Sequence, residues 1–156
     1  MAVRVQVEDF DVGAELEALA KGKHGIGGVA LFVGLVRDLA SGEPIGAMEL
    51  EHYPGMTETE LESIEAEALS RWPLEETLIV HRYGRLEPGD RIVLAAAASA
   101  HREAAFEACR FIMDFLKTRA PFWKKEDTPD GGQWVDARSS DDDATRRWVE
   151  KEQAAE

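Results

Sequence analysis

The feature that most constrains the fold is an apolar strand that continues directly into a long amphipathic helix. Residues 91–99, RIVLAAAAS, are small and apolar and predict a buried strand. In residues 101–118 the apolar side chains recur at helical spacing and form one broad face, made of Ala105, Phe106, Cys109, Ile112, Met113 and Leu116. Such a face is stable only when it packs against another element, so the sequence predicts helices packed on a sheet.

The remaining segments predict an α+β fold. Alternating or β-rich segments predict strands at 3–7, 28–37, 45–53 and 77–83, and helical spacing predicts helices at 13–20, 57–72 and 140–152. Residues 122–137 predict a hairpin around Asp130-Gly131-Gly132. Strands and helices alternate only loosely, which favours a mixed, largely antiparallel sheet with helices packed on it. A chain of 156 residues is expected to form a single domain, 1–156, with a C-terminal hairpin and helix.

Two local patterns give sharper predictions. Thr57 and Glu60 have the spacing of a capping box and predict the start of a helix. The apolar stripe of that helix comprises Leu61, Ile64, Ala68 and Trp72. Gly34 interrupts an apolar strand, which predicts a bulge or a close approach of another chain segment.

Charge and cysteine content exclude several classes of protein. The chain has 18 basic and 31 acidic residues and a net charge of −13, so its overall field does not favour nucleic acid. The single cysteine, Cys109, excludes an internal disulfide and a cysteine-based zinc site, and its apolar surroundings predict a buried thiol. No apolar run approaches the ~20 residues that cross a bilayer, and the N-terminus does not resemble a signal peptide, so a cytoplasmic protein is expected.

No motif indicates a metal ion or a cofactor. His24 and His52 lack metal-ligand spacing, and strand alternation splits Glu49, Glu51 and His52 between two faces. The chain contains no phosphate-binding loop, no dinucleotide-binding glycine motif and no nucleophile elbow. We therefore predict neither a metal site nor a cofactor.

The stretch from Lys117 to Lys125 is the strongest candidate for a binding site. It contains four cations, including Arg119 and Lys124, and no acid, although the chain as a whole is acidic. The two aromatic residues before Lys124 would desolvate a nearby ammonium, which lowers its pKa and makes it a better proton donor or nucleophile. A solvated hairpin with scattered lysines fits the same residues.

Two further segments place cations at the ends of strands. His101 and Arg102 begin the helix after Ser99, where free N–H groups and the helix dipole favour an anion. Arg37 follows a buried strand, where a guanidinium can bind a phosphate or carboxylate in a bidentate manner or pair with Asp38. Plain solvent exposure would explain both segments as well. His81 and Arg82 lie in an alternating strand and are interpreted as structural. The three cationic segments together indicate a site for an anionic small molecule.

Five motifs occur in order along the chain, namely FVGLVR (32–37), LEHYPGM (50–56), HRYGRLEPGD (81–90), SAHR (99–102) and LKTRAPFWKKE (116–126). The segment WVDAR (134–138) follows them. With these motifs the chain resembles the large, catalytic subunit of the molybdopterin synthase family from about Gly28 to Trp148. Each motif alone is weak, whereas the ordered set is specific.

The resemblance implies an α+β fold and a sulfurtransferase. Members of the family add two sulfurs to cyclic pyranopterin monophosphate and so form molybdopterin. The sulfur arrives as a thiocarboxylate on the C-terminal Gly-Gly of a small ubiquitin-like partner. The family assembles as a heterotetramer around a homodimer of the large subunit, and it uses neither nucleic acid nor a membrane.

The resemblance also assigns site residues, position by position. Lys117 and Lys124 match the family's essential lysines and are expected to be catalytic. The substrate-binding set that it implies comprises Leu35, Val36, Arg37, His101, Arg102, Lys117, Lys124, Lys125, Glu126 and Arg138. Of these, Arg138 would reach the pocket from the second subunit of the dimer. Leu35 departs from the family pattern, because relatives often carry a lysine there.

Two other functions stay open at this point. The chain would be a non-catalytic scaffold for a ubiquitin-like sulfur carrier if it kept only a docking surface, but the retention of Lys117 and Lys124 argues against this. It would be an unrelated enzyme if it acted on a phosphorylated metabolite without a protein partner. Co-purification with a small protein ending in Gly-Gly would argue against that alternative.

Overall fold

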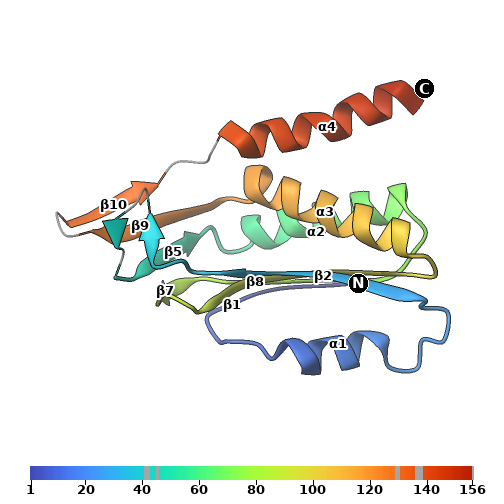
Figure 1. Cartoon of the computed structure of the whole chain (residues 1–156), viewed down its shortest axis with the longest axis horizontal. Coiled ribbons are helices and arrows are strands. Elements are labelled where there is room, and N and C mark those ends of the chain that lie inside the picture. Colours follow the sequence, from blue (N-terminus) through green and yellow to red (C-terminus); the bar gives the residue numbers. More distant parts are fainter. Residues whose placement is uncertain (41–42, 45, 129–130, 136–138, 156) are drawn as a thin grey trace.

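The computed structural model describes the backbone of residues 1–40, 43–44, 46–128, 131–135 and 139–155, and the side chains of residues 1–38, 46–123 and 142–152. Two four-stranded sheets form the centre of the molecule, and helices cover both faces of the larger one (Figure 1). No helix in the described part of the chain combines the length and apolarity needed to cross a membrane.

The larger sheet has the strand order β1 (Ala2–Gln6), β6 (Leu74–Arg82), β8 (Arg91–Ser99) and β2 (Gly28–Leu35). β1 runs parallel to β6, and the other neighbours are antiparallel. Helices α2 (Met56–Arg71) and α3 (Arg102–Arg119) cover one face, and α1 (Val12–Ala20) covers the other (Figure 1). β2 therefore forms one edge of this sheet.

Alternation along the central strands divides the core between the two faces. Ile79 packs with Leu61 and Phe111 beneath α2 and α3, whereas the neighbouring Leu78 packs with Leu19 of α1. Small residues in β8, such as the fully buried Ala95 and Ala97, let α3 approach the sheet closely. This explains why the alanine-rich strand and the long helix occur together in the sequence.

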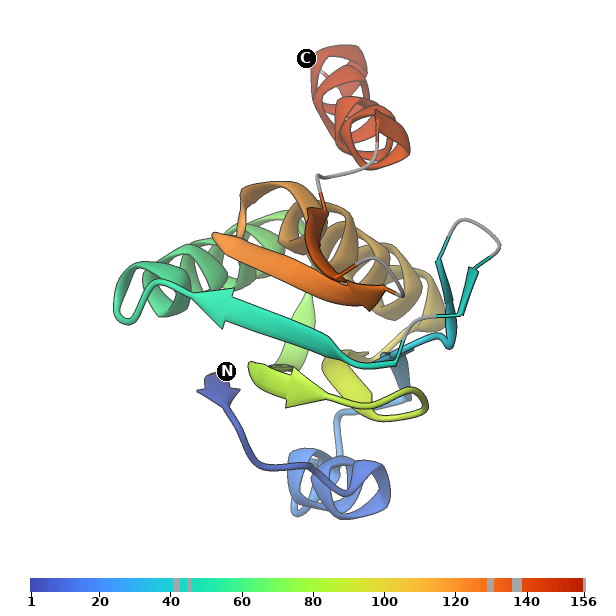
Figure 2. The same ribbon diagram turned by 90° about the vertical axis from the view of Figure 1, so that its left-hand side faces the viewer.

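The smaller sheet has the order β10 (Gly131–Val135), β9 (Phe122–Thr128), β5 (Met48–His52) and β7 (Gly84–Leu86), and all of its pairs are antiparallel. It projects from the end of the larger sheet at which α3 finishes (Figures 1 and 2). Two short strands, β3 (Leu39–Ala40) and β4 (Glu43–Pro44), pair with each other between β2 and β5. The predicted mixed, largely antiparallel α+β fold is thus confirmed.

Helix α4 (Ser139–Ala155) lies on the outer side of α3 (Figures 1 and 2). Its Trp148 is 1% exposed and packs edge-on against Trp72 and Phe111, with ring centroids 5.6 and 5.4 Å away. The indole Nε1–H donates a hydrogen bond of 2.7 Å to Asp114. An aromatic residue buried with its polar atom satisfied holds α4 on the body of the molecule.

Gly34 has the role that its position predicts. The register between β2 and β8 shifts between Gly34 and Leu35, which marks a bulge. A Cβ atom at position 34 would lie 2.7 Å from Cγ1 of Val93, closer than two carbons can approach. The glycine therefore permits both the bulge and the close contact that precede Arg37.

The predicted capping box of Thr57 and Glu60 is wrong. Helix α2 begins one residue earlier, after Gly55 with φ of 84°, and the Gly55 N–H donates to Glu58 at 2.6 Å. Thr57 is fully buried in the first turn. The sharp turn at Gly55 moves the helix start, so the acid three residues later is Glu58 rather than Glu60.

Candidate functional site

The two lysines of the candidate site lie on either side of a chain reversal. Lys117 is in the last turn of α3 and is exposed in the single chain, so the predicted desolvation is not found there. The chain turns at Ala120-Pro121 and enters β9, where the backbone of Lys124 lies between Leu50 of β5 and Val135 of β10. The side chains of Lys124, Lys125, Glu126 and Arg138 lie outside the described residues.

An aromatic cluster underlies this reversal. The His81 ring, at the end of β6, stacks on Phe122 with centroids 3.8 Å apart and planes 18° apart. His52 lies 4.1 Å from Tyr83 and 6.4 Å from Phe122 between ring centroids. Next to it, Tyr53 and Trp123 contact each other at 4.4 Å. The segment between the lysines thus contacts rings that lie on, or directly after, strands β5 and β6.

His81 is held in its neutral form. Burial lowers its pKa to about 3, and the charges of Lys117 and His52 act in the same direction, against a hydrogen bond to the backbone of Arg82. Since a carbonyl oxygen only accepts, the 2.8 Å contact of Nδ1 with the Arg82 oxygen means that Nδ1 carries the proton. The predicted structural role of His81 agrees with its burial and with this bond.

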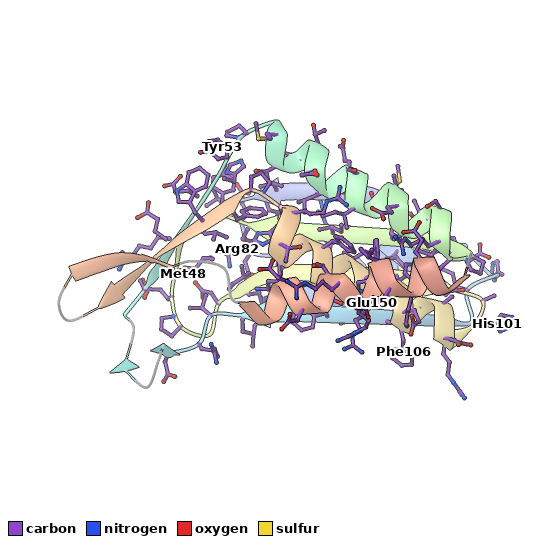
Figure 3. The ribbon with its side chains drawn as sticks, turned by 90° about the horizontal axis from the view of Figure 1, so that it is seen from above. Met48, Tyr53, Arg82, His101, Phe106 and Glu150 are labelled. Atoms are coloured by element: carbon purple, nitrogen blue, oxygen red, sulfur yellow. The ribbon has the colours of Figure 1, made fainter. Side chains whose placement is uncertain are left out.

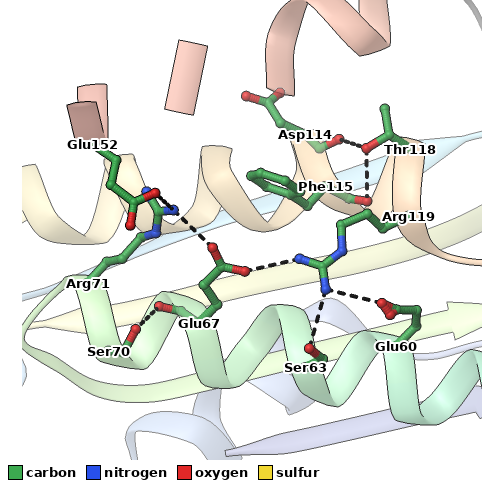
Figure 4. Close-up of polar contacts among 10 residues, drawn as sticks. All are labelled: Glu60, Ser63, Glu67, Ser70, Arg71, Asp114, Phe115, Thr118, Arg119 and Glu152. Carbon is green, nitrogen blue, oxygen red and sulfur yellow. Dashed lines mark hydrogen bonds and ion pairs between the residues drawn. The ribbon is translucent and has the colours of Figure 1, made fainter. Parts of the chain in front are cut away.

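Arg119 does not belong to an open cationic strip. Its guanidinium donates to Glu67 at 3.0 Å, to Glu60 at 3.1 Å and to Ser63 at 3.3 Å, all on α2 (Figure 4). It also lies over the Phe115 ring at 5.5 Å. Two carboxylates therefore match its charge, and Arg119 ties the end of α3 to α2. The prediction of four cations without an acid holds for the sequence but not for the space around Arg119.

Arg37 is exposed at the end of β2, beside an open depression of about 520 Å³ lined by Val36, Arg37, Asp38, Pro88 and Gly89. Val36 is buried, and its N–H and C=O bond to Asp90 and Gly89 at 2.9 and 2.8 Å. Leu35, by contrast, is 53% exposed. In the described part of the chain Arg37 forms no ion pair with Asp38, so the guanidinium is available to an anion.

His101 and Arg102 lie far from the lysines in the single chain. His101 is the N-cap of α3 and Arg102 its first residue, and both side chains are exposed. At about 1.5 Å per residue, Lys117 lies about 22 Å from Arg102 along the helix. Figure 3 shows His101 at one end of the molecule, well away from Arg82 and Met48. One chain therefore does not unite the predicted substrate-binding residues, because α3 separates them by its full length.

The aromatic cluster is the part of the site that sequence reasoning missed. His52, His81 and Tyr83 lie within the quoted motifs, but their strands are distant in sequence from Phe122. The residues described by the structure contain no group of three or more histidine, cysteine or acidic side chains suited to a metal ion. Cys109 is buried, and burial raises the pKa of its thiol to about 11, which suits the predicted core position.

Comparison with known proteins identifies the family. The MoaE protein family matches residues 5–119. The molybdopterin synthase catalytic subunit of Pseudomonas aeruginosa is 60% identical over 96% of this chain and 100% of its own. A molybdopterin biosynthesis MoaE protein from Burkholderia ambifaria has a TM-score of 0.83 and 58% identity over 96% of this chain and 99% of its own. Molybdopterin synthase from Staphylococcus aureus has a TM-score of 0.79 and 33% identity over 85% and 96% of the two chains. The resemblance is confirmed, and the chain belongs to the MoaE protein family.

Proposed function

We propose that the chain is the catalytic subunit of a molybdopterin synthase, which converts cyclic pyranopterin monophosphate into molybdopterin. The observation that carries this proposal is the 60% identity to a catalytic subunit over the whole of that relative. Two sulfurs would come from the thiocarboxylated C-terminus of a small ubiquitin-like subunit. Because thiocarboxylates and dithiolenes are sensitive to oxidation, the reducing cytoplasm is the compartment that suits this chemistry.

The lysines supply the proton transfers that the reaction needs. The thiocarboxylate sulfur forms a bond to a substrate carbon as a C–O bond at that carbon breaks and its oxygen leaves. Water then cleaves the acyl–sulfur bond, which leaves the sulfur on the substrate and a carboxylate on the partner. We assign Lys117 to the partner's tail and the reacting carbon, and Lys124 to acid–base catalysis or charge stabilisation. Both lie at the reversal between α3 and β9, which an extended tail can approach from solvent because Lys117 is exposed.

The arginines and the start of α3 suit the substrate phosphate. Arg37 is exposed beside an open depression, and Arg102 stands where the free N–H groups of a helix favour an anion. The proposed substrate-binding set is the one that the resemblance assigns: Leu35, Val36, Arg37, His101, Arg102, Lys117, Lys124, Lys125, Glu126 and Arg138.

The separation of His101 and Arg102 from Lys117 supports a site completed by a second copy of the chain. β2 is an edge strand about 24 Å long, similar to the separation along α3. A two-fold axis at its middle would place Gly28 of one copy beside Leu35 of the other. Because Gly27 donates to the Ser99 oxygen at 2.9 Å, the segment around His101 would then lie level with Arg37 of the other copy.

Exposed apolar side chains lie where such a two-fold axis would pass. Leu31 and Phe32, at the middle of β2, are 39% and 45% exposed, and Phe106 on the neighbouring α3 is 65% exposed. Apolar surface of this kind marks an interaction site. A homodimer formed along β2 would cover it.

Phe32→Asp is expected to convert this dimer largely to monomer. A two-fold contact repeats each substitution, so two carboxylates would face each other in an apolar interface. Sedimentation velocity would measure the change in mass. Met56→Asp, at an exposed residue on α2, which packs over β1 and β6 and not over β2, should leave the dimer intact. A dimeric Phe32→Asp variant would refute the proposed interface.

The reaction itself tests the proposed function. The protein, a thiocarboxylated partner and cyclic pyranopterin monophosphate are mixed, and molybdopterin is quantified as its fluorescent oxidation product. We expect product only when all three are present. Partner binding without sulfur transfer would indicate a scaffold, and turnover of a phosphorylated metabolite without the partner would indicate an unrelated enzyme.

A further inference from the structure

The chain reversal between Lys117 and Lys124 is held by one hydrogen bond from α2 and one within the turn. The Thr57 hydroxyl donates to the Pro121 oxygen at 3.2 Å, and the Phe122 N–H donates to the Ala120 oxygen at 2.8 Å. These bonds fix the backbone of the turn. The direction in which β9 leaves the turn also depends on Phe122, the first residue of that strand.

The Phe122 side chain packs against a single well-defined surface, the ring of His81. Its ring lies flat on His81, with centroids 3.8 Å apart and an 18° angle between the planes. His81 is 5% exposed, and its Nδ1–H bond to the Arg82 oxygen fixes the plane of the imidazole. β6, which carries His81, is an inner strand paired with both β1 and β8. The ring against which Phe122 packs is therefore fixed to an inner strand of the larger sheet.

We propose that His81 is a positioning residue of the sulfur-transfer site. Its ring packs against Phe122 and thereby fixes the placement of Lys124 relative to Lys117. The inference rests on the proposed function, since it assigns both lysines to the reaction. Phe122 precedes Lys124 by two residues in β9, and Lys117 lies close enough to act on His81 electrostatically. The ring thus contacts the segment between the two lysines and interacts electrostatically with one of them.

A neutral ring suits this place better than a charged one. Among the residues with described side chains, Lys117 and His52 are the charged or titratable groups that act on His81 across space, and Arg82 follows it in the strand. An imidazolium at this point would add a positive charge beside Lys117 in a buried setting. The burial of the ring and the charges of Lys117 and His52 favour the neutral imidazole and outweigh the Nδ1–H bond, which leaves Lys117 as the cation at the surface.

The contribution of the stack can be separated from that of the ring nitrogen by two substitutions. His81→Phe keeps a flat ring against Phe122 and loses the bond to Arg82, whereas His81→Asn keeps a donor near the Nδ1 position and loses the ring. Phe122→Leu removes the stack from the other side. We expect His81→Asn and Phe122→Leu to lower kcat by about 10- to 100-fold, because catalysis is sensitive to small displacements. The kcat of His81→Phe should stay within about 3-fold of the wild-type value. The KM for the partner should change little in any of these variants.

The double variant His81→Asn/Phe122→Leu distinguishes positioning through the stack from two unrelated effects. If His81 acts through Phe122, the double variant loses no more kcat than either single variant. Losses that multiply would overturn the proposal, as would equal losses in His81→Phe and His81→Asn. If His81→Asn does not fold, Phe122→Leu against His81→Phe decides the question. His24→Asn, at an exposed loop histidine, is the matched control and should leave kcat unchanged.

A measurement without turnover separates this inference from the proposed function. Lysines are reductively methylated with ¹³C, and the Lys117 signal is assigned from its loss in Lys117→Ala. We expect this signal to shift in His81→Asn and in Phe122→Leu but little in His81→Phe. Such shifts in a protein that makes no molybdopterin would refute the proposed function but support the positioning role of His81. An unchanged Lys117 signal in all variants of an active enzyme would refute only the positioning role of His81.

Discussion

Replacing Lys117 by alanine is expected to abolish molybdopterin formation with a thiocarboxylated partner. Lys117 is exposed at the end of α3, where it can reach an entering tail. Loss of a group that transfers protons typically lowers the rate by about 10²- to 10⁴-fold. Single-turnover assays, with product measured after oxidation, would give the rate of the chemical step.

The fold should be unaffected by that change. Lys117 is exposed, and the helix around it is held by Arg119, whose guanidinium binds Glu60 and Glu67. Thermal unfolding of Lys117→Ala is therefore expected to match that of the wild type. Lys151→Ala, which removes an exposed lysine paired with Glu107 on α3, is the matched control and should retain activity. Turnover of Lys117→Ala close to wild type would remove Lys117 from the proposed mechanism.

Mixing two inactive variants is expected to restore activity if the site is shared between copies. In a heterodimer of Lys117→Ala and His101→Ala, one of the two sites combines an intact Lys117 with an intact His101 from the other copy. Random exchange makes half of the dimers mixed, so about a quarter of the wild-type rate should return. The rate is measured after incubation long enough for subunits to exchange, which labelled protein can follow.

The same mixture gives the opposite result if each chain builds its own site. One copy would then lack Lys117 and the other His101, so neither site would be complete and no activity would return. Mixing Lys117→Ala with Lys124→Ala is the control, because both lysines are assigned to the same copy. That mixture should stay inactive in either case. Recovery there would place the two lysines in different copies.

The elements of the fold could be predicted from periodicity, whereas the contacts between them could not. The buried strand 91–99 and the helix after it have the predicted bounds to within one residue. The capping box failed because the T-x-x-E spacing does not show that the chain turns at Gly55. Helix starts depend on backbone geometry that several adjacent residues can supply.

The cations of the candidate site show the same limit more clearly. Arg119 and Lys117 look alike in the sequence, yet the acids that neutralise Arg119 lie 59 and 52 residues away on α2. The stack of His81 on Phe122 likewise joins residues that are 41 positions apart in the sequence. Family motifs located the lysines, but only the tertiary structure separates a cation that can meet substrate from one that braces two helices.

The length of α3 has a consequence for how two sites would work together. In the proposed dimer each α3 presents Arg102 to one site and Lys117 to the other, so a single helix spans both reaction centres. A tilt of this helix on substrate binding would move Arg102 in one reaction centre and Lys117 in the other at the same time. Its attachments to α2 through Arg119 and to α4 through Trp148 restrain that tilt. The stiffness of one helix would thus set whether the two halves of the enzyme turn over independently or in concert.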